Sequence, residues 1–318
     1  MNPRVSVCIP CWNSERTISR ALESVLAQTC GDFEVIVSDN ASTDGTVDIV
    51  RSFRDSRIRL HQNPANVDCY PNSNISWRLS TGDLITFLHS DDIYEPNRLS
   101  LLTQMLREHP EAVFAYNAVT LVDEKGNVLE TLRGHPASTI LEGIEELRYQ
   151  LGFRTGEVGI MNPPLVHRSV MEKVGGYDVR FPLSADRHLH WKLCTVGKVA
   201  YCAESLYCWS VHPYVFDHEP FMVPYGNYYA LRGFLEDYGS DLEINRITRR
   251  ALQNHKSLTA LIWASHALVS KRKDPLRLVS PLSLLTMAIA LSPGTILGAP
   301  FSPRIWRKWR KKRAEGKV

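Results

Sequence analysis

Short apolar runs alternate with amphipathic stretches along the first part of the chain. The runs at 5–9, 33–38 and 84–88 are rich in β-branched and aromatic residues and end in polar, turn-forming residues, as buried strands do. Between the first two runs, residues 14–28 carry apolar side chains at helical spacing, namely Ile18, Ala21, Leu22, Val25 and Leu26. This stripe predicts a helix that lies on a sheet.

Further elements follow the same alternation. The sequence predicts a strand at 57–61, a helix that opens at Glu95-Pro96, because proline suits a first helical turn, and more β structure in AVFAY and AVTLV. Strands that alternate with helices of about 10–15 residues are typical of βαβ units and a mainly parallel sheet. The chain is therefore predicted to be an α/β protein.

Polar side chains follow three of the predicted strands, in PCWN, SDNASTDG and HSDD. Ligands of parallel sheets bind outside the carboxyl ends of the strands, so neighbouring strands would bring these loops to one crevice. The last loop ends in two adjacent carboxylates, Asp91 and Asp92. A divalent cation such as Mg²⁺ or Mn²⁺ relieves their repulsion and commonly carries a substrate phosphate as well. The pair is equally consistent with a solvated turn.

Four other polar or aromatic residues fit a binding site, each with a structural alternative. Asp39 follows directly on the second strand and would accept hydrogen bonds from a base or ribose, or would form a turn. Trp12 would stack on a base, or would pack in the core. Asp186 precedes an apolar helix and fits either a helix cap or a base at the rim of a site. His212 lies in a loop-like stretch and fits either a structural role or a metal ligand.

The amino-acid composition indicates the class of protein and the cellular compartment. The chain has 318 residues, enough for one large domain or two ordinary ones, and its 44% hydrophobic and 22% charged residues fit a soluble globular protein. Its seven cysteines are dispersed and odd in number, and no secretory signal is visible, so we expect a reducing cytosol. Cys8 and Cys11 form a lone CxxC, which we interpret as packing rather than as a metal or redox site.

The C-terminal end is strongly basic. From Arg304 onward eight Lys or Arg stand against one Glu, a net +7, so the rest of the chain carries about 3 − 7 = −4. The segment 276–300 is apolar, but prolines interrupt it, and we expect no spanning helix. Tryptophans and clustered basic residues beside it predict an anchor on an anionic membrane surface. The alternatives are a solvated basic terminus and, least favoured, a nucleic-acid contact.

With these pieces in place, the chain resembles the inverting family 2 glycosyltransferases of the GT-A fold. Four stretches carry the resemblance in the family's order and spacing: VSVCIPCWNSERTISRALESVLAQT, DFEVIVSDNASTDGT, NPANVDCYPNSNISWRLSTGDLITFLHSDDIYEPNRL and GGYDVRFPLSADRHLHWKL. SLYCWSVHP is a weaker match, and together they span roughly residues 4–213. The resemblance implies a GT-A, Rossmann-like, mainly parallel sheet flanked by helices, with a helical C-terminal extension.

The resemblance also implies the members of a nucleotide pocket. Pro10, Trp12 and Asn13 would line it, and Asp39 would contact the base, commonly uracil. Asp91 would join the pocket through a metal ion that it binds together with the diphosphate.

A second group concerns the metal and the chemistry. The resemblance implies that Asp91 binds Mn²⁺ or Mg²⁺, that Asp92 orients the site or adds a ligand, and that His212 lies near the diphosphate or the metal. Asp186 matches the general base. His89 stands where the family usually has an acidic residue, so its imidazole is a further candidate for a metal or ribose contact.

Two more positions depart from the family. Ser73 stands where an arginine is common, and Ala185 stands where an acidic residue usually precedes the base. Asp91 and Asp186 are both present.

We therefore expect a metal-dependent inverting transferase. It would move a sugar from a nucleotide-sugar, above all a UDP-sugar, to a hydroxyl of a glycan or lipid-linked acceptor in cell-surface polysaccharide synthesis, at the cytoplasmic face of the membrane and without nucleic acid. The transferase domain is expected at 1–225, with a nucleotide half at about 1–120 and an acceptor half at about 121–225, followed by the helical extension at 226–318.

Two other functions remain open on the sequence. One is a degenerate, non-catalytic, nucleotide-binding member of the same fold. The other is a nucleotidyltransferase, which would need a glycine-rich, basic phosphate loop that PCWNSERT does not supply.

Overall fold

The computed structural model describes most of the chain, in the ranges 5–152, 162–211 and 222–254. Contacts divide the chain into a large unit, residues 1–153 with 158–248, and a smaller one, residues 154–157 with 249–318. All of the geometry below belongs to the large unit. In the smaller one the described residues, 249–254, are helical.

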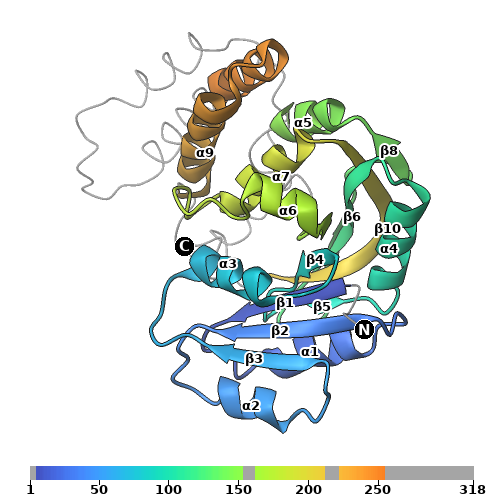
Figure 1. The fold of residues 1–318 in the computed structure, drawn as a ribbon, viewed down its shortest axis with the longest axis vertical. Helices are drawn as coiled ribbons and strands as arrows, with labels where there is room; N and C mark the ends of the chain where they lie inside the picture. The colour runs from blue at the N-terminus through green and yellow to red at the C-terminus, as the bar shows by residue number, and fades with distance from the viewer. Residues whose placement is uncertain (1–4, 153–161, 212–221, 255–318) are drawn as a thin grey trace, which may run out of the picture. The chain divides into compact units, whose positions relative to one another are not determined.

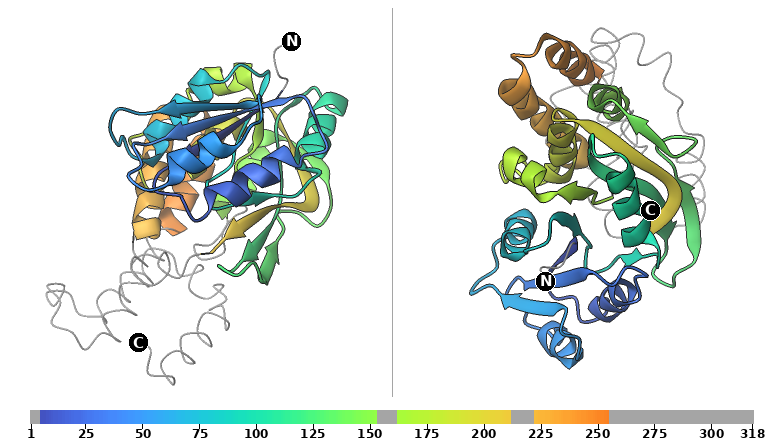
Figure 2. Two further views of the ribbon diagram at one scale, coloured as in Figure 1. Left: turned by 90° about the horizontal axis from the view of Figure 1, so that it is seen from below. Right: turned by 45° about the vertical axis from the view of Figure 1, so that its right-hand side comes forward.

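The N-terminal part is a parallel four-stranded sheet with helices on both faces (Figures 1 and 2). In spatial order the strands are β3 (Ile58–Gln62), β2 (Phe33–Asp39), β1 (Val5–Cys11) and β4 (Leu84–Phe87). The helices between them are α1 (Ile18–Leu26), α2 (Thr46–Ser52) and α3 (Cys69–Leu79). All residues of β1 and β2 are buried, as expected for a parallel sheet that is covered on both faces.

The first helix begins later than the predicted start at residue 14. The helix starts at Ile18, and residues 15–17 form a turn, because the carbonyl of Ser14 accepts hydrogen bonds from the N–H groups of Thr17 and Ile18. The stripe itself is confirmed, since the buried residues of α1 are Ile18, Ala21, Leu22 and Val25.

The sheet continues beyond β4 with mixed strand directions. In spatial order the added strands are β9 (Leu165–His167), β6 (Ala112–Val122), β10 (Lys198–Ser210) and β5 (Ile93–Tyr94). β9 is antiparallel to both of its neighbours, whereas β6 and β10 run parallel over ten paired positions. Two outer strands, β7 (Val128–Leu132) and β8 (Thr139–Leu141), pair with β6 and β10.

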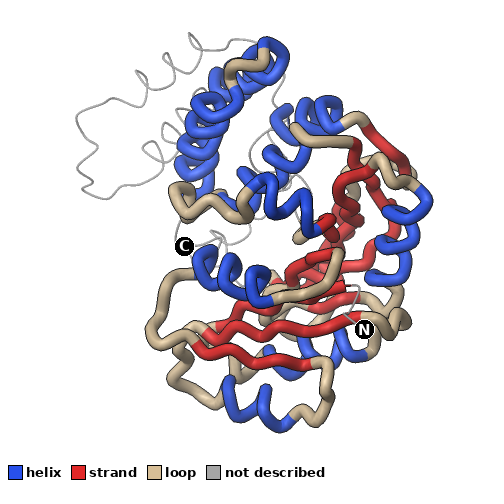
Figure 3. The backbone as a smooth tube through the Cα atoms, viewed as in Figure 1, coloured by secondary structure: helices blue, strands red, loops and turns tan. Residues whose placement is uncertain are grey.

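Helices cover this second part of the sheet (Figure 3). They are α4 (Arg98–Glu108), α5 (Gly143–Gly152), α6 (Arg168–Val174), α7 (Ala185–Cys194) and α9 (Met222–Tyr238). Residues 242–248 of the large unit are also helical. α7 lies among α5, α6 and α9, and most of its side chains are buried. The helix that carries the predicted base, Asp186, in its first turn is therefore held by three other helices.

A buried arginine joins strands of the two parts. Arg98 is fully buried at the start of α4, and its guanidinium donates hydrogen bonds to the side chains of Thr86 and Asn117 and to the carbonyl of Pro163. The guanidinium also lies over the ring of Tyr94, 4.1 Å from its centroid. Because these partners come from β4, β6, β5 and the segment before β9, Arg98 ties the middle of the sheet together.

Within the described ranges, no helix is long and apolar enough to cross a membrane. The apolar segment 276–300 and the basic tail, which were predicted to contact a membrane surface, lie outside those ranges. The domain boundary at 225 stays a prediction.

Candidate functional site

The three polar loops that follow β1, β2 and β4 meet at one edge of the sheet, because their strands are neighbours. Asn13 connects the first two loops: its N–H donates to Ser42 Oγ at 2.9 Å, and its Oδ1 accepts from the N–H of Thr43 at 2.8 Å. The hydroxyls of Ser14 and Ser90 are 2.8 Å apart and connect the first loop to the third. The structure therefore forms the shared site that the strand ends predicted.

The residues predicted to line a nucleotide pocket differ in exposure. Trp12 is 55% exposed, so its ring is accessible for stacking and is not a core aromatic. Asn13 has a left-handed backbone, with φ of +48°, which its hydrogen bonds to the second loop hold in place. Pro10 is buried in β1 and pairs with Ser38 of β2.

Asp39 is fully buried at the end of β2. Its Oδ2 accepts a 3.2 Å hydrogen bond from the N–H of Ser42, which closes a turn over it. A base would therefore contact Asp39 only after the 40–43 loop has moved. Both the turn and the base contact remain consistent with this position.

A buried asparagine network that no sequence motif predicted lies behind the second loop. The side chain of Asn63 donates to Asn40 Oδ1 and Asn72 Oδ1, and Asn72 in turn bonds both the hydroxyl and the carbonyl of Ser38. This network fixes the loop after β2 to the start of α3. Its only sequence signal is the density of asparagines in NPAN and PNSN.

Asp92 serves as an anchor of the HSDD loop. The residue is only 2% exposed; its Oδ2 accepts a hydrogen bond from the hydroxyl of Tyr207 at 2.6 Å, and its Oδ1 accepts one from the N–H of Ser210 at 2.8 Å. His89 Nδ1 lies 3.4 Å from Asp92 Oδ2. Because both carboxylate oxygens are engaged, the geometry favours an orienting role for Asp92 over a role as a metal ligand.

Asp91 is partly exposed beside this anchor. Its backbone carbonyl accepts a 2.5 Å hydrogen bond from the hydroxyl of Ser210, so the end of β10 holds both aspartates. His89 is 46% exposed at the same loop. Desolvation lowers the pKa of His89, but the hydrogen bond to Asp92 and the charges of Asp92, Asp91 and Asp186 outweigh it and raise this pKa.

Asp186 lies in the first turn of α7 and is partly exposed. Its charge reaches the same groups as that of Asp91. Both carboxylates act on His89, and after desolvation of the sulfur they also raise the pKa of the Cys69 thiol. The charges of Asp91 and Asp186, which are 95 residues apart in the sequence, thus act on the same two groups.

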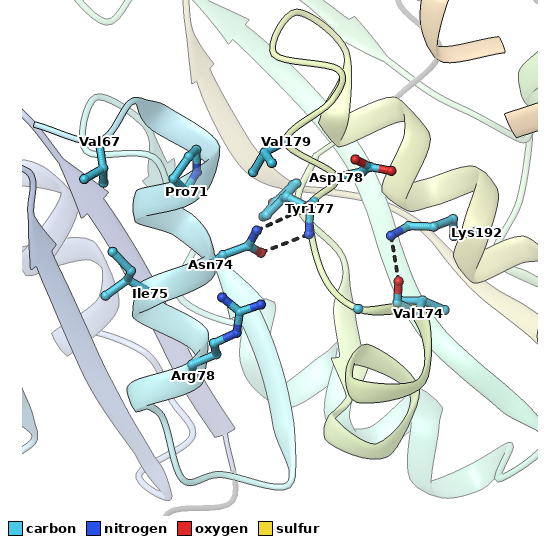
Figure 4. Close-up of a pocket in the computed structure, with 11 residues that line it drawn as sticks. Val67, Pro71, Asn74, Ile75, Arg78, Val174, Tyr177, Asp178, Val179 and Lys192 are labelled. Atoms are coloured by element: carbon cyan, nitrogen blue, oxygen red, sulfur yellow. Dashed lines mark hydrogen bonds between the residues drawn. The ribbon is translucent and has the colours of Figure 1, made fainter. Parts of the chain in front are cut away.

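Two tyrosines support the region near Asp186. The rings of Tyr70 and Tyr177 have their centroids 5.1 Å apart, and burial followed by the charge of Asp186 raises the pKa of each phenol. The backbone of Tyr177 is held by Asn74, whose side chain bonds both its N–H and its carbonyl (Figure 4).

A cavity of about 600 Å³ opens between α3 and the segment that follows α6 (Figure 4). Its walls carry Ile75 and Arg78 from α3, Val179 and Asp178 from the segment, and Lys192 from α7. None of the residues predicted from the sequence for the nucleotide, the metal or the base lines this cavity.

Comparison with known proteins then decides the family. A model of glycosyl transferase family 2 matches residues 6–175, which is more than half of the chain.

The chain belongs to glycosyl transferase family 2.

The match includes the three loops and the HSDD sequence, and it ends before Asp186.

Curated relatives of this chain include bacterial glycosyltransferases. The putative glycosyltransferase EpsE of Bacillus subtilis is 31% identical over 180 residues, which is 55% of this chain and 58% of EpsE. An uncharacterised glycosyltransferase of Nostoc is 25% identical over 218 residues, 66% of this chain and 65% of that protein. WfgD of Escherichia coli, a UDP-Glc:alpha-D-GlcNAc-diphosphoundecaprenol beta-1,3-glucosyltransferase, is 38% identical over 102 residues, 32% of this chain and 40% of WfgD. The chain covers less than two thirds of the length of each of these relatives.

Solved structures share the GT-A fold with the transferase. S. aureus TarS in complex with UDP superposes with a TM-score of 0.66 and 17% identity, covering 91% of this chain and 81% of the other. The mannosyltransferase PcManGT of Pyrobaculum calidifontis, in complex with GDP-Man and Mn²⁺, superposes with a TM-score of 0.57 and 17% identity, covering 99% and 85%. At these identities the likeness concerns the fold.

The predicted metal ligands do not form a complete group within the described residues. His212 lies outside those residues. The one group of three potential ligands found there consists of Asp178, His188 and Asp237, none of which the sequence analysis singled out. This group belongs to the α6–α7 segment, α7 and α9 and is distinct from the HSDD loop.

Proposed function

We propose that this family 2 protein is an inverting glycosyltransferase that moves a sugar from a UDP-sugar to a hydroxyl of a glycan or lipid-linked acceptor. The observation that carries the proposal is the meeting of the loops after β1, β2 and β4 at one edge of the sheet, in a chain that matches family 2 over residues 6–175. A donor held at this edge through Asp91 needs a base beside it, because one group holds the diphosphate while the other deprotonates the attacking hydroxyl.

The residues of the HSDD loop fit a hard divalent cation. Asp91 offers a partly exposed carboxylate and His89 an exposed imidazole, and these are ligands that Mn²⁺ accepts. A bound Mn²⁺ or Mg²⁺ ion would neutralise the charge of the diphosphate leaving group. Asp92 keeps the loop in place through Tyr207 and Ser210, and we assign His212 to the same site.

Asp186 is assigned as the general base. It sits at the N-terminus of α7, is open to solvent in part, and is held by the N–H of Arg187, which donates to its Oδ1 at 2.8 Å. Its second oxygen would accept the proton of the acceptor hydroxyl, which then attacks the anomeric carbon from the face opposite the leaving group. The configuration of that carbon is inverted, and no covalent sugar–enzyme intermediate forms.

The nucleotide is assigned to the loops after β1 and β2. Trp12 would stack on the base, Asn13 and Pro10 would shape the pocket, and Asp39 would bond the base once the loop above it has moved. The UDP complex of TarS and the UDP-Glc donor in the name of WfgD support a uridine nucleotide. Because PcManGT was solved with GDP-Man, GDP is the nucleotide to compare with UDP.

The acceptor and location are proposed from the relatives and the tail. The name of WfgD supports an acceptor linked to a lipid diphosphate, as would be used in cell-surface polysaccharide synthesis. Such an acceptor suits a protein whose basic C-terminal tail binds the anionic inner face of the membrane.

The proposal is tested by titrating the full-length protein with UDP, with and without Mn²⁺. We expect tight binding that requires Mn²⁺ and is lost in Asp91→Ala, but persists in Asp83→Ala, which changes an exposed carboxylate at the opposite end of β4. GDP should bind more weakly. Tight binding without Mn²⁺, or binding unaffected by Asp91→Ala, would contradict the assigned site.

Turnover separates the enzyme from the non-catalytic alternative. With a UDP-sugar panel, we expect slow donor hydrolysis or transfer that Asp186→Asn abolishes while UDP binding remains near normal. Glu172→Gln, an exposed change on α6, is the matched control. UDP binding without any turnover by the wild-type protein would favour a non-catalytic member of the fold. The residues that support this alternative are His89, Ser73 and Ala185, which differ from the family's usual pattern.

A further inference from the structure

Two carboxylates and a histidine lie close together at α7, the helix that also carries Asp186. Asp178 belongs to the α6–α7 segment, His188 to α7 and Asp237 to α9, and one ligand atom from each lies within 4.8 Å of the others. The nucleotide, metal and base residues proposed above do not include any of the three, so this group needs its own explanation.

His188 is the unusual member. It is fully buried, and neither of its ring nitrogens has a hydrogen-bond partner among the residues that the structure describes. Its neighbours are aromatic: the ring of Phe181 lies 4.6 Å away, and those of Phe234 and Trp191 lie 5.9 and 6.3 Å away. Buried polar groups without a partner are rare and commonly mark an ion or water.

The carboxylate of Asp178 lies beside the His188 ring. The His188 Nδ1 and Asp178 Oδ2 atoms are 4.0 Å apart, too far for a hydrogen bond but suited to two ligands of one ion.

A cation already joins the two carboxylates. Arg180 Nη2 donates to Asp178 Oδ2 at 2.7 Å and to Asp237 Oδ2 at 2.5 Å, which offsets the repulsion of the two acids. The Arg180 side chain is 54% exposed, so it can turn out into solvent without creating a cavity. Arg180 satisfies both carboxylates and leaves His188 unpaired.

We propose that Asp178, His188 and Asp237 form a binding site for a divalent transition-metal ion, Zn²⁺ or Mn²⁺, and that Arg180 takes the place of the ion in its absence. One imidazole nitrogen with two carboxylates is a donor set that such ions accept, and it disfavours Mg²⁺ and Ca²⁺, which prefer oxygen alone. Donors on one tetrahedral ion lie about 3.4 Å apart, so the side chains must close by roughly 1 Å as Arg180 leaves.

The ion would have a structural role rather than a role in sugar transfer. It would connect α9 and the α6–α7 segment to α7, two residues after Asp186. Stabilising that helix would hold the proposed base in position without contacting the donor. This inference does not rest on the proposed function, because the three residues lie apart from the HSDD loop.

The test measures metal binding by the full-length protein without nucleotide. Thermal unfolding is measured at increasing Zn²⁺ concentrations, and bound Zn²⁺ should raise Tm by a few degrees until the site is saturated. Co²⁺ bound to the same nitrogen and oxygen ligands should give visible absorption bands. Asp237→Asn should weaken binding at least about tenfold and remove the Co²⁺ bands. Glu236→Gln, its exposed neighbour on α9, should leave both readouts unchanged.

Two further variants sharpen the result. Arg180→Gln removes the competing cation, so it should lower Tm without metal, bind Zn²⁺ more tightly than the wild type and show a larger rise in Tm. Asp91→Ala should bind Zn²⁺ at this site as the wild type does, which separates the site from the one proposed for the donor. Binding that survives Asp237→Asn, or no saturable binding in either the wild type or Arg180→Gln, would overturn the proposal.

Discussion

The hydroxyl of Tyr207 donates a 2.6 Å hydrogen bond to Oδ2 of Asp92, a residue 115 positions earlier in the chain. Both side chains are 2% exposed. Because burial raises the pKa of Asp92, offset in part by His89, this bond is one of the interactions that keep a charged carboxylate inside the protein. The loop that carries the proposed metal ligand thus depends on a residue of β10.

Removing that hydroxyl gives a direct test of the anchor. Tyr207→Phe should lower the free energy of unfolding by about 1–3 kcal/mol, because it leaves an oxygen of buried Asp92 with one partner fewer. We also expect weaker Mn²⁺-dependent UDP binding, since the loop is less restrained. Urea unfolding and UDP titration measure the two effects, and a variant with wild-type values in both would show that the bond does not hold the loop.

The buried arginine allows a second prediction. Arg98→Lys keeps the positive charge but cannot reproduce the three hydrogen bonds of the guanidinium, so we expect a loss of about 2–4 kcal/mol in the free energy of unfolding. Arg107→Lys, at an exposed position of the same helix, should change stability by less than about 0.5 kcal/mol. Similar losses for both variants would contradict the structural role of Arg98.

His190 predicts how stability changes with pH. Burial lowers its pKa from 6.5 to about 4 in the folded protein. Between these values the unfolded chain binds the proton and the folded chain does not, so stability is full above about pH 6.5 and falls as the pH drops toward 4. The loss amounts to at most about 3 kcal/mol. Denaturant unfolding from pH 7 to 4.5 should show this slope, and His190→Gln should reduce it; an unchanged slope would point to other groups.

Substitutions at two adjacent glycines, Gly175 and Gly176, allow the cost of backbone strain to be measured separately from the cost of a steric clash. Gly175 and Gly176 have φ of +77° and +72°, so alanine at either position adopts a strained backbone. A Cβ at Gly175 would meet nothing, whereas one at Gly176 would lie 2.6 Å from Asn74 Oδ1 and 2.8 Å from Trp77 Nε1. Gly175→Ala should cost about 1 kcal/mol, and Gly176→Ala about 1–3 kcal/mol more. Equal thermal stabilities would refute the contact.

Trp12 should matter for binding and not for folding. Since its side chain is 55% exposed, Trp12→Ala should change the free energy of unfolding little. If its ring stacks on a base, the variant should lose about 1–3 kcal/mol of nucleotide affinity, roughly a 5- to 150-fold rise in the Kd for UDP. Val128→Ala, another exposed apolar position, is the control. An unchanged Kd would remove Trp12 from the nucleotide pocket.

Local patterns were enough to predict the N-terminal half of the fold. The strands at 5–9, 33–38 and 84–88 were recognisable because each is an apolar run with a polar end, and their neighbouring order then brings the three loops together. The helix stripe was right, but the start of the helix was not, because the hydrogen bonds of Ser14 to other loops and to its own turn cannot be read from spacing.

The rest depended on contacts between distant parts of the chain. No sequence pattern predicts that β9 lies between β4 and β6 and is antiparallel to both, or that Asp92 is buried beside Tyr207. Nothing in the sequence distinguishes His188 from other helical positions, because its surroundings depend on the packing of α9 against α7. The carboxylates of Asp178 and Asp237 are likewise brought together by tertiary packing.

The order of the strands has a consequence for engineering. Because β9, from residues 165–167, separates β4 from β6, and because β10 both pairs along β6 and closes over the HSDD loop, a cut near residue 120 would expose unpaired strand edges on both fragments. The predicted nucleotide half and the predicted acceptor half would therefore not be interchangeable modules. A chimera could take its first 120 residues from one transferase and the remainder from another. The end of its β10 would then have to fit an HSDD loop from a different protein before the chimera could fold. Changes of donor or acceptor preference are therefore better sought within single loops.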